Sequence, residues 1–437
     1  MEPPGVRARI WIPVVIGLVA AAVRLVGLGS PPSTYWDEQY YVFDAAAYLN
    51  GGIGVPVSDP DPPPLTIRDE GTWVHPPLGK WAIALGVGPL GVHPLGWRLP
   101  STAFGLAGVL LLYALGLELW GSPWWAGLAA GMLALDGLHI VQSRMATLDV
   151  FLTTWILAGI YLLVLDRTRE GGQGGDWLSR VFGGGYRLGA GLCLGAAVAT
   201  KWSGLLALAF AVIVCAAWSR RNEGARLRAK PHTFLTSFIL APLCVYLASY
   251  GSFWVQHGPA VGAFLTLQMR MLSHQLNHTQ IQPENSAPWT WPLLLHPIRY
   301  FGPQAVSGGV REVLAVGNPA LWWGFLILVP LAAVRVARRR MTWKDAVAWG
   351  GYLSMILPWL AAGRTQFIYY ALPAVPFLCL AATAELRALG PTGVKVSLAW
   401  GCLIVAIALW FLPAWTATPV PAGWLTSLRL LSSWPGG

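Results

Sequence analysis

The sequence carries two adjacent carboxylates, Asp37 and Glu38, inside an aromatic run from Tyr35 to Tyr41. The pair directly follows the first long apolar segment, so we expect it to lie where the chain leaves a membrane. A charged side chain beside a bilayer is costly unless it is solvated, paired or used in function. Further charged residues stand at the ends of other apolar segments, namely Arg98, Arg144, Asp149, Lys201 and Arg364.

Carboxylates and cations gathered in one pocket suit a reaction in which a hydroxyl displaces a phosphate. A carboxylate can take the proton of the attacking hydroxyl. Arginine and lysine can hold a phosphate and stabilise the charge that grows on it as it leaves. The glycine-rich segment 166–187 follows no strand and has no Walker lysine, so a nucleotide donor is not indicated. We therefore expect a lipid-linked phosphate donor that is reached from the bilayer.

Each of these residues also has a purely structural interpretation. Asp37 and Glu38 can be the ordinary solvated start of a loop. Asp149 can cap a helix or pair with Arg144, and Lys201 can extend along the membrane surface to lipid headgroups. The gathering of several charges on one face favours function over these alternatives.

The elements that position these residues belong to a membrane protein. The chain has 437 residues, of which 55% are hydrophobic and 11% charged, whereas a soluble domain has about a quarter charged residues. The formal charge of +10 does not indicate nucleic acid, because the basic residues cluster in short loops between apolar segments. The five cysteines lie inside apolar segments without metal-ligand spacing, so we expect no metal site.

A helix needs about 20 apolar residues to cross a bilayer, and this length predicts an all-α polytopic fold with about eleven transmembrane helices. They lie roughly at 10–29, 98–119, 123–141, 147–165, 187–200, 203–219, 232–251, 320–337, 346–362, 367–384 and 396–413. With the N-terminus in the cytoplasm, most lysines and arginines fall in cytoplasmic loops, as the positive-inside rule requires. The loop with Asp37 and Glu38 is then on the outer face.

Two outer loops are long. The first spans about 30–97 and contains the catalytic Asp-Glu candidate, and we expect its Asp44 and Glu70 to be solvated. The second spans about 252–319. We expect interfacial helices and turns in both loops, and one membrane domain over residues 1–437.

Several motifs in order along the chain resemble those of the protein O-mannosyltransferases. They are Trp36-Asp37-Glu38 with Tyr40-Tyr41, His75-Pro76-Pro77-Leu78-Gly79-Lys80-Trp81, Arg98, the segment from Arg144 to Asp149, Lys201-Trp202-Ser203-Gly204, Ser286-Ala287-Pro288-Trp289-Thr290-Trp291-Pro292, and Phe367-Ile368-Tyr369-Tyr370. The His-Pro-Pro-Leu-Gly-Lys and Lys-Trp-Ser-Gly pieces are specific. The resemblance implies a GT-C glycosyltransferase fold and a bacterial form, because the second outer loop has no room for the β-trefoil MIR domain of eukaryotic members.

The resemblance also implies roles for residues. Asp37 is expected to be the catalytic base, with Glu38 beside it. Substrate-binding roles are expected for Arg98, His75, Lys80, Arg144, Asp149, Lys201, Trp202, Arg364, Tyr369, Tyr370, Ser286 and Trp289, with Arg98, Lys201 and Arg364 as candidates to hold the phosphate.

The implied donor is polyprenyl-phosphate mannose, and the implied acceptor is a Ser/Thr-containing polypeptide, delivered by the secretion translocon to the outer face of a bacterial cell membrane. Some GT-C enzymes use a divalent metal, but no ligand set here supports one. Two alternatives stay open: a GT-C enzyme with a lipid or cell-wall glycan acceptor, and a transporter or flippase. Charges at the outer face and the lack of an inverted repeat argue against a transporter.

Overall fold

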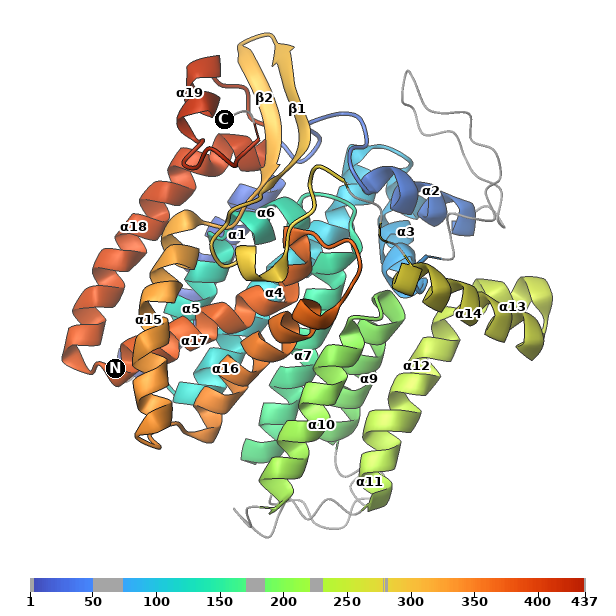
Figure 1. Cartoon of the computed structure of the whole chain (residues 1–437), viewed down its shortest axis with the longest axis horizontal. Helices are drawn as coiled ribbons and strands as arrows, with labels where there is room; N and C mark the ends of the chain where they lie inside the picture. Colours follow the sequence, from blue (N-terminus) through green and yellow to red (C-terminus); the bar gives the residue numbers. More distant parts are fainter. Residues whose placement is uncertain are drawn as a thin grey trace.

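The computed structural model of the chain describes residues 4–49, 74–169, 185–220, 231–277, 279 and 282–435. The first half consists of α1 (Pro4–Leu25), α2 (Glu38–Leu49), α3 (Leu78–Leu90), α4 (Pro94–Trp120), α5 (Pro123–Ala134), α6 (Gly137–Ser143), α7 (Leu148–Arg169), α9 (Gly185–Thr200), α10 (Gly204–Arg220), α11 (Pro231–Leu235), the short π-helix η2 (Thr236–Leu240) and α12 (Ala241–Ser249). The second half consists of α13 (Gly251–His257), α14 (Val261–Asn277), η3 (Pro288–Thr290), β1 (Ile298–Val306), β2 (Gly309–Ala315), α15 (Pro319–Ala337), α16 (Trp343–Ile356), η4 (Leu357–Ala361), η5 (Ile368–Ala374), α17 (Val375–Ala388), α18 (Pro391–Thr416) and α19 (Ala422–Ser427). Figure 1 shows a helical bundle with a hairpin at one end.

The expected membrane spans all fall on helices, but their number is not confirmed. By length and composition, seven of the described helices can each cross a membrane, or eight if α5 and α6 form one span with a 64° bend. Helices α9 and α16 have 16 and 14 residues, which is short of the roughly 20 that a span requires. The fold is therefore helical and multi-spanning, as expected.

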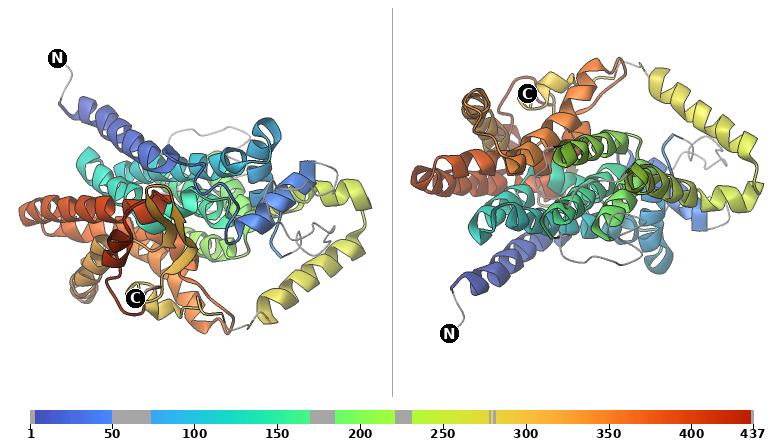
Figure 2. Two further views of the ribbon diagram at one scale, coloured as in Figure 1. Left: turned by 90° about the horizontal axis from the view of Figure 1, so that it is seen from above. Right: turned by 90° about the horizontal axis from the view of Figure 1, so that it is seen from below.

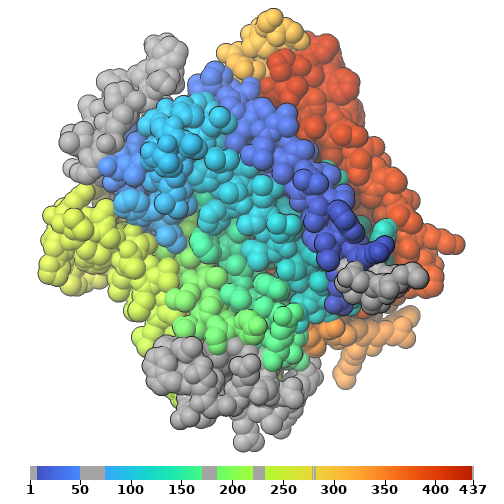
Figure 3. Space-filling view, turned by 180° about the vertical axis from the view of Figure 1, so that it is seen from behind, coloured from blue at the N-terminus to red at the C-terminus, as the bar shows by residue number. Residues whose placement is uncertain are grey.

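The bundle has a buried centre and an apolar periphery. The span made of η5 and α17 is 100% buried and that of α7 is 78% buried. In contrast, only 11% of the α1 span and 22% of the α15 and α18 spans are buried. Figure 3 shows α1 as a ridge on the outside of the bundle, where it packs on α4 and α5. The exposed faces of these peripheral helices are apolar, which suits contact with lipid.

The described helix pair α13 and α14 projects sideways from the bundle (Figure 2). The exposed side chains of α14 include Leu265, Met269 and Leu276, which are 57%, 64% and 67% exposed. A helix with one such apolar face has the amphipathic character expected of an interfacial helix.

The same loop also contains a β-hairpin, where we expected interfacial helices and turns alone. Strands β1 and β2 pair antiparallel, from Ile298 opposite Ala315 to Val306 opposite Gly309. Gly308 in the connecting turn has a φ of 92°, a conformation that glycine adopts without steric cost. A glycine-containing turn of two residues between strand-forming segments is a hairpin signal, so the sequence did contain this information.

The hairpin is attached to the segment after α18. Val310 and Val420 form an isolated antiparallel bridge. The buried carboxylate of Glu312 accepts hydrogen bonds from Arg429 at 2.6 and 2.7 Å and contacts Arg299 at 3.3 Å. A buried carboxylate needs such partners, so these contacts fix the hairpin on the bundle.

Candidate active site

The adjacent carboxylates Asp37 and Glu38 lie in different environments. Glu38 begins α2 and is fully buried. It accepts two hydrogen bonds of 2.9 Å from Arg98 and one of 2.9 Å from the backbone N–H of Ala146. The backbone N–H of Tyr35 donates to it at 3.4 Å. Glu38 is thus committed to contacts within the protein.

Arg98 is committed in the same way. In addition to Glu38, it donates to the backbone carbonyl oxygens of Leu28 at 3.1 Å, Pro31 at 2.8 Å and Ser33 at 3.0 Å. These contacts use all the N–H donors of a guanidinium, and Arg98 is completely buried. The expectation that Arg98 holds the donor phosphate is therefore corrected: it fixes the irregular segment between α1 and α2.

Arg144 also has a structural role in place of the expected substrate contact. Its guanidinium donates to the carbonyl oxygens of Arg24 and Val26, both at 2.8 Å, and of Gly27 at 2.9 Å. These carbonyls lie at the end of α1 and just beyond it, where helical partners are missing. Arg144 therefore ties α1 to the turn between α6 and α7.

Asp37 is partly exposed, and its carboxylate makes no ion pair or hydrogen bond with another side chain in the described part of the chain. Burial raises the pKa of Asp37 to about 6, while the positive charge of Lys201 lowers this pKa and the negative charge of Asp149 raises it. Asp37 is thus close enough to both charges to interact with them. A carboxylate with this pKa is largely ionised at neutral pH and suits a general base. The preceding residue, Trp36, has a φ of 51°, a strained backbone conformation of the kind that gathers at functional sites.

Lys201 and Asp149 form a buried ion pair in which the ammonium lies 2.9 and 3.1 Å from the two carboxylate oxygens. The ammonium also lies 4.6 Å from the ring centre of Tyr370 and 5.5 Å from that of Tyr369, within the range of cation–π attraction. Asp149 therefore pairs with Lys201 and not with Arg144. The structure brings these residues together beside Asp37.

Aromatic side chains from distant segments enclose this region. The ring of Trp36 lies 5.1 Å from that of Tyr300 and 6.2 Å from that of Phe367. The hydroxyl of Tyr300 accepts a hydrogen bond of 2.7 Å from Gln142. Sequence reasoning missed Tyr300 because it missed the hairpin, and no motif marked Gln142.

Lys80 pairs with a carboxylate of α2, and its positive charge also acts on His75. Its ammonium lies 2.9 Å from a carboxylate oxygen of Asp44, and both side chains are 1% exposed. The expectation that Asp44 is solvated was therefore wrong, while Glu70 lies outside the described residues. The neighbouring Gly79 has no room for a Cβ, which would lie 2.7 Å from Leu148. Lys80 thus joins α3 to α2, and Gly79 lets α3 pack closely on α7.

A pocket of about 320 Å³ opens beside the Lys201 ammonium. Its lining includes His75, Lys201, Trp202, Leu205, Leu206, Gln275, Pro358, Trp359, Arg364 and Tyr370. Arg364 contacts Gln275 and donates to the hydroxyl of Tyr370 at 3.3 Å. Burial and the nearby positive charges of Lys201, Lys80 and Arg364 lower the pKa of His75 well below its ordinary value, so it is neutral. We call this the cationic pocket, because two cations meet an apolar wall there.

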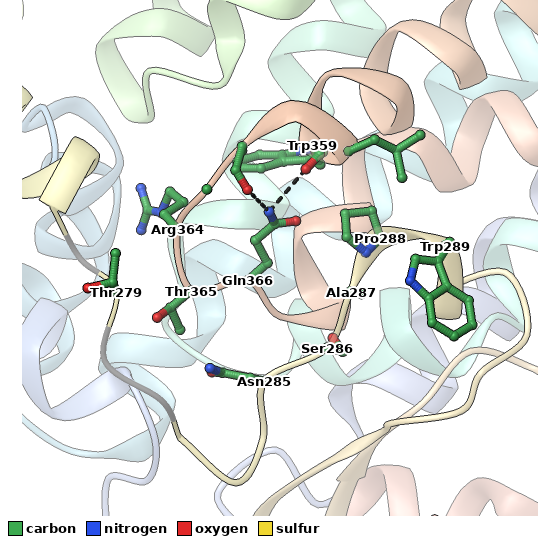
Figure 4. A pocket seen from close by; sticks show the side chains of 13 residues that line it. Thr279, Asn285, Ser286, Ala287, Pro288, Trp289, Trp359, Arg364, Thr365 and Gln366 are labelled. Atoms are coloured by element: carbon green, nitrogen blue, oxygen red, sulfur yellow. Dashed lines mark hydrogen bonds between the residues drawn. The ribbon is translucent and has the colours of Figure 1, made fainter.

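A larger cleft of about 510 Å³ adjoins the cationic pocket and shares Trp359, Ala362 and Arg364 with it. Figure 4 shows Arg364 and Trp289 at opposite ends of this cleft. Ser286 lies in its wall, and its backbone N–H donates to the carbonyl oxygen of Gln366 at 2.9 Å. We call this the polar cleft, after the hydroxyl and amide side chains in its lining.

The site residues expected from the sequence thus fall into three groups. Around Asp37 and the cationic pocket lie Asp149, Lys201, Trp202, His75, Arg364, Tyr369 and Tyr370. Ser286 and Trp289 line the polar cleft. Four further residues are buried and support the fold through contacts with the rest of the protein: Glu38, Arg98, Arg144 and Lys80. Within the described residues, no three or more His, Cys, Asp and Glu side chains are arranged to hold a metal ion.

Two family models cover most of the chain. Residues 14–257 match the model of the dolichyl-phosphate-mannose-protein mannosyltransferases, and residues 260–434 match that of the C-terminal four-transmembrane region of protein O-mannosyltransferases. The chain belongs to the protein O-mannosyltransferase family. The resemblance noted in the sequence is therefore confirmed, and the protein is a mannosyltransferase.

Bacterial protein O-mannosyltransferases match this one over nearly its full length. The polyprenol-phosphate-mannose–protein mannosyltransferases of Mycolicibacterium smegmatis and Mycobacterium tuberculosis are each 30% identical to it, over 95% of this chain and 91% and 90% of theirs. The enzyme of the same name from Corynebacterium glutamicum is 29% identical over 96% of this chain and 92% of its own.

Solved structures of related fold include a protein O-mannosyltransferase. In the yeast Pmt1-Pmt2 complex bound to the sugar donor, one chain matches with a TM-score of 0.83 at 14% identity, over 98% of this chain and 92% of that one. ArnT from Cupriavidus metallidurans bound to undecaprenyl phosphate matches with a TM-score of 0.60 at 16% identity, over 90% of this chain and 63% of that one. These similarities establish the GT-C fold of the protein O-mannosyltransferase described here.

Proposed function

We propose that this mannosyltransferase transfers mannose from polyprenyl-phosphate mannose to the hydroxyl of serine or threonine in a polypeptide. The donor and acceptor classes are those in the names of relatives that match over nearly the whole chain. The observation that carries the residue assignment is the difference between the two adjacent carboxylates. Glu38 has every oxygen engaged by the protein, whereas Asp37 is partly exposed and uncommitted, so Asp37 is the base.

The chemistry is a single displacement at the anomeric carbon. Asp37 takes the proton of the acceptor hydroxyl, and the hydroxyl oxygen forms a bond to the anomeric carbon of a β-linked mannosyl phosphate. The bond between that carbon and the phosphate oxygen breaks, and polyprenyl phosphate leaves with the electron pair. The product is an α-mannoside. Because phosphate is a good leaving group, the reaction requires no general acid.

The cationic pocket suits the phosphate of the donor. Lys201 and Arg364 line it together with the neutral His75, so two positive charges and an imidazole can meet the oxygens that gain charge as the bond breaks. Lys201 would share its charge between Asp149 and the phosphate. The apolar wall includes Leu205 of α10, which is 51% exposed, and this surface suits the first part of the polyprenyl chain.

We place the protein in a bacterial cell membrane with its N-terminus in the cytoplasm and the site on the outer face. Figure 1 shows the N-terminus at one end of the bundle and the C-terminus at the other. The turn between α15 and α16 lies at the same end as the N-terminus (Figure 1) and carries Arg338, Arg339 and Arg340. The positive-inside rule assigns that end to the cytoplasm. A site at the opposite end would meet polypeptides delivered by the secretion translocon.

A transfer assay tests the proposed function. Membranes that contain the protein are incubated with labelled polyprenyl-phosphate mannose and a threonine-rich peptide, and label is counted in the peptide and in the lipid extract. We expect α-mannosidase-sensitive label in the peptide, and its loss when Asp37 is changed to Asn. Label found only in a lipid or glycan fraction would refute the protein acceptor and favour the alternative GT-C reaction.

A further inference from the structure

One face of helix α14 reaches the cationic pocket. The covered residues of this helix include Phe264, Gln268, Met271 and Gln275, and steps of three or four residues place them on one helix face. The exposed apolar side chains of α14 lie on the opposite face. The two glutamines are separated by about two helical turns, so both extend from the covered face toward the pocket.

Gln268 joins α14 to the wall of this pocket. Its side-chain oxygen accepts a hydrogen bond of 2.6 Å from the hydroxyl of Tyr246. The oxygen of that hydroxyl in turn accepts a hydrogen bond of 2.9 Å from the indole N–H of Trp202. Trp202 follows Lys201 in the chain and lines the cationic pocket. A chain of hydrogen bonds therefore fixes the middle of α14 beside the pocket.

Gln275 lines the pocket itself, and its partners determine the orientation of its amide. The guanidinium of Arg364 contacts the side-chain oxygen of Gln275. Because a guanidinium can only donate hydrogen bonds, the amide oxygen must face Arg364. The amide nitrogen then points the other way and donates to the carbonyl oxygen of Val74 at 2.9 Å. Both ends of the amide are thus engaged.

These contacts join three segments that are far apart in the sequence. Val74 precedes His75 in the first outer loop. Gln275 belongs to the second outer loop, and Arg364 follows η4. In Figure 4, Arg364 lies at the same end of the polar cleft as Thr279, which follows α14. One amide therefore sets the spacing between His75 and Arg364, the two groups that flank it in the cationic pocket.

Arg364 keeps a donor available for a ligand while Gln275 holds it. A terminal nitrogen of its guanidinium donates to the hydroxyl of Tyr370 at 3.3 Å. Its Nε is buried and has no hydrogen-bond partner within the described structure. A buried donor without an acceptor is costly, so an anionic oxygen is favoured there. Arg98 differs, because the protein itself uses its donors.

We infer that Gln275 is a positioning residue for the donor phosphate, which holds the guanidinium of Arg364 at a fixed distance from His75. The inference rests on the proposed function, which places the phosphate in the cationic pocket, and it adds a residue that no sequence motif marked. Gln275 acts through Arg364. The hydrogen bond to Val74 anchors the amide, so that the remaining N–H groups of Arg364 stay directed at the phosphate.

Steady-state kinetics of the full-length enzyme in detergent tests this assignment through the KM for polyprenyl-phosphate mannose and the KM for a threonine peptide. Gln275→Met keeps the length of the side chain and removes both hydrogen bonds, and it is studied alone and combined with Arg364→Ala. Gln275→Glu keeps the acceptor for Arg364, which preserves folding, but its negative charge offsets that of the guanidinium. The matched control is Asn277→Met, because Asn277 is exposed in the same helix.

We expect Gln275→Met and Gln275→Glu each to raise the donor KM about fivefold, the size of effect that one hydrogen bond has, and to leave the peptide KM unchanged. Arg364→Ala raises the donor KM about tenfold. The double variant raises it no further than Arg364→Ala alone, because a residue that acts through Arg364 has no separate effect once Arg364 is absent. Asn277→Met changes neither KM.

The inference is overturned, while the proposed function stands, by an unchanged donor KM in both Gln275 variants. Effects of Gln275→Met and Arg364→Ala that multiply in the double variant overturn it as well, and so does an unchanged donor KM in Arg364→Ala. Wild-type enzyme that does not use polyprenyl-phosphate mannose refutes the proposed function itself.

Discussion

Replacing each of the two adjacent carboxylates with its amide, one at a time, separates catalysis from folding. Asp37→Asn removes a group that no other side chain in the described structure binds. Glu38→Gln removes the charge that faces the guanidinium of Arg98 across two hydrogen bonds of 2.9 Å. Both substitutions replace a carboxylate with an amide, and the two positions are adjacent in the chain. Each variant is therefore the control for the other.

The two substitutions are expected to change different quantities: Asp37→Asn lowers turnover, and Glu38→Gln lowers the free energy of unfolding. Loss of a general base lowers turnover by about 10²–10⁴-fold, or about 3–5 kcal/mol of transition-state stabilisation. Asp37→Asn should change the free energy of unfolding by less than about 0.5 kcal/mol, because the carboxylate has no partner to lose. Glu38→Gln leaves Arg98 charged and fully buried, and breaking a buried ion pair from one side costs about 3–5 kcal/mol.

Two measurements on each purified variant distinguish a catalytic role from a structural one. They are the thermal unfolding midpoint in detergent and the turnover number at saturating donor and peptide. Asp37→Asn should unfold at the wild-type temperature and be nearly inactive. Glu38→Gln should unfold at a clearly lower temperature, while molecules that remain folded keep substantial turnover. If Glu38→Gln is stable and inactive while Asp37→Asn is active, the base is Glu38, and its contacts with Arg98 do not prevent it from accepting the proton.

Three further predictions concern pH, the donor and topology. Because the pKa of Asp37 is about 6 and only the ionised form accepts a proton, turnover should be constant at high pH and fall about tenfold per unit well below pH 6. Lys201→Met removes the charge that lowers this pKa, so the acid limb of the profile should move to higher pH, whereas an unmoved limb would show that another group titrates. Arg364→Ala should raise the donor KM about tenfold, since a charged hydrogen bond contributes about 1.5–3 kcal/mol, and an unchanged donor KM would remove Arg364 from the phosphate site. Reporter domains fused after Arg340 and after Trp424 should lie on opposite sides of the membrane, and a result with both on one side would refute the proposed topology.

Much of the scaffold could be predicted from the sequence because its apolar segments are long and end at charges. The segment from Tyr35 to Tyr41, Asp149 and Lys201 were found in this way, and the structure brings them together. The number of spans could not be predicted, because helices such as α9 and α16 are shorter than a typical span. In addition, the number of residues that a helix needs to cross the bilayer depends on its tilt.

The sequence could not predict which charged residues line the site and which support the fold. Arg98, Arg144 and Lys201 have the same appearance in the sequence, since each ends or begins an apolar segment. What distinguishes them is irregular backbone near Leu28 and Gly27, whose carbonyl oxygens the two arginines satisfy. Unpaired carbonyls of this kind depend on the tertiary path of the chain and leave no residue pattern.

The attachment of the hairpin has a consequence for biosynthesis. Tyr300, which contacts the Trp36 ring, lies in β1, and the hairpin is held through Glu312 by Arg429. The ribosome must therefore translate nearly the whole chain before the wall of the site can reach its final position. Early membrane helices insert first, but the enzyme becomes competent only after its last contacts form. A partly synthesised chain would thus sit in the membrane without the complete wall of its active site.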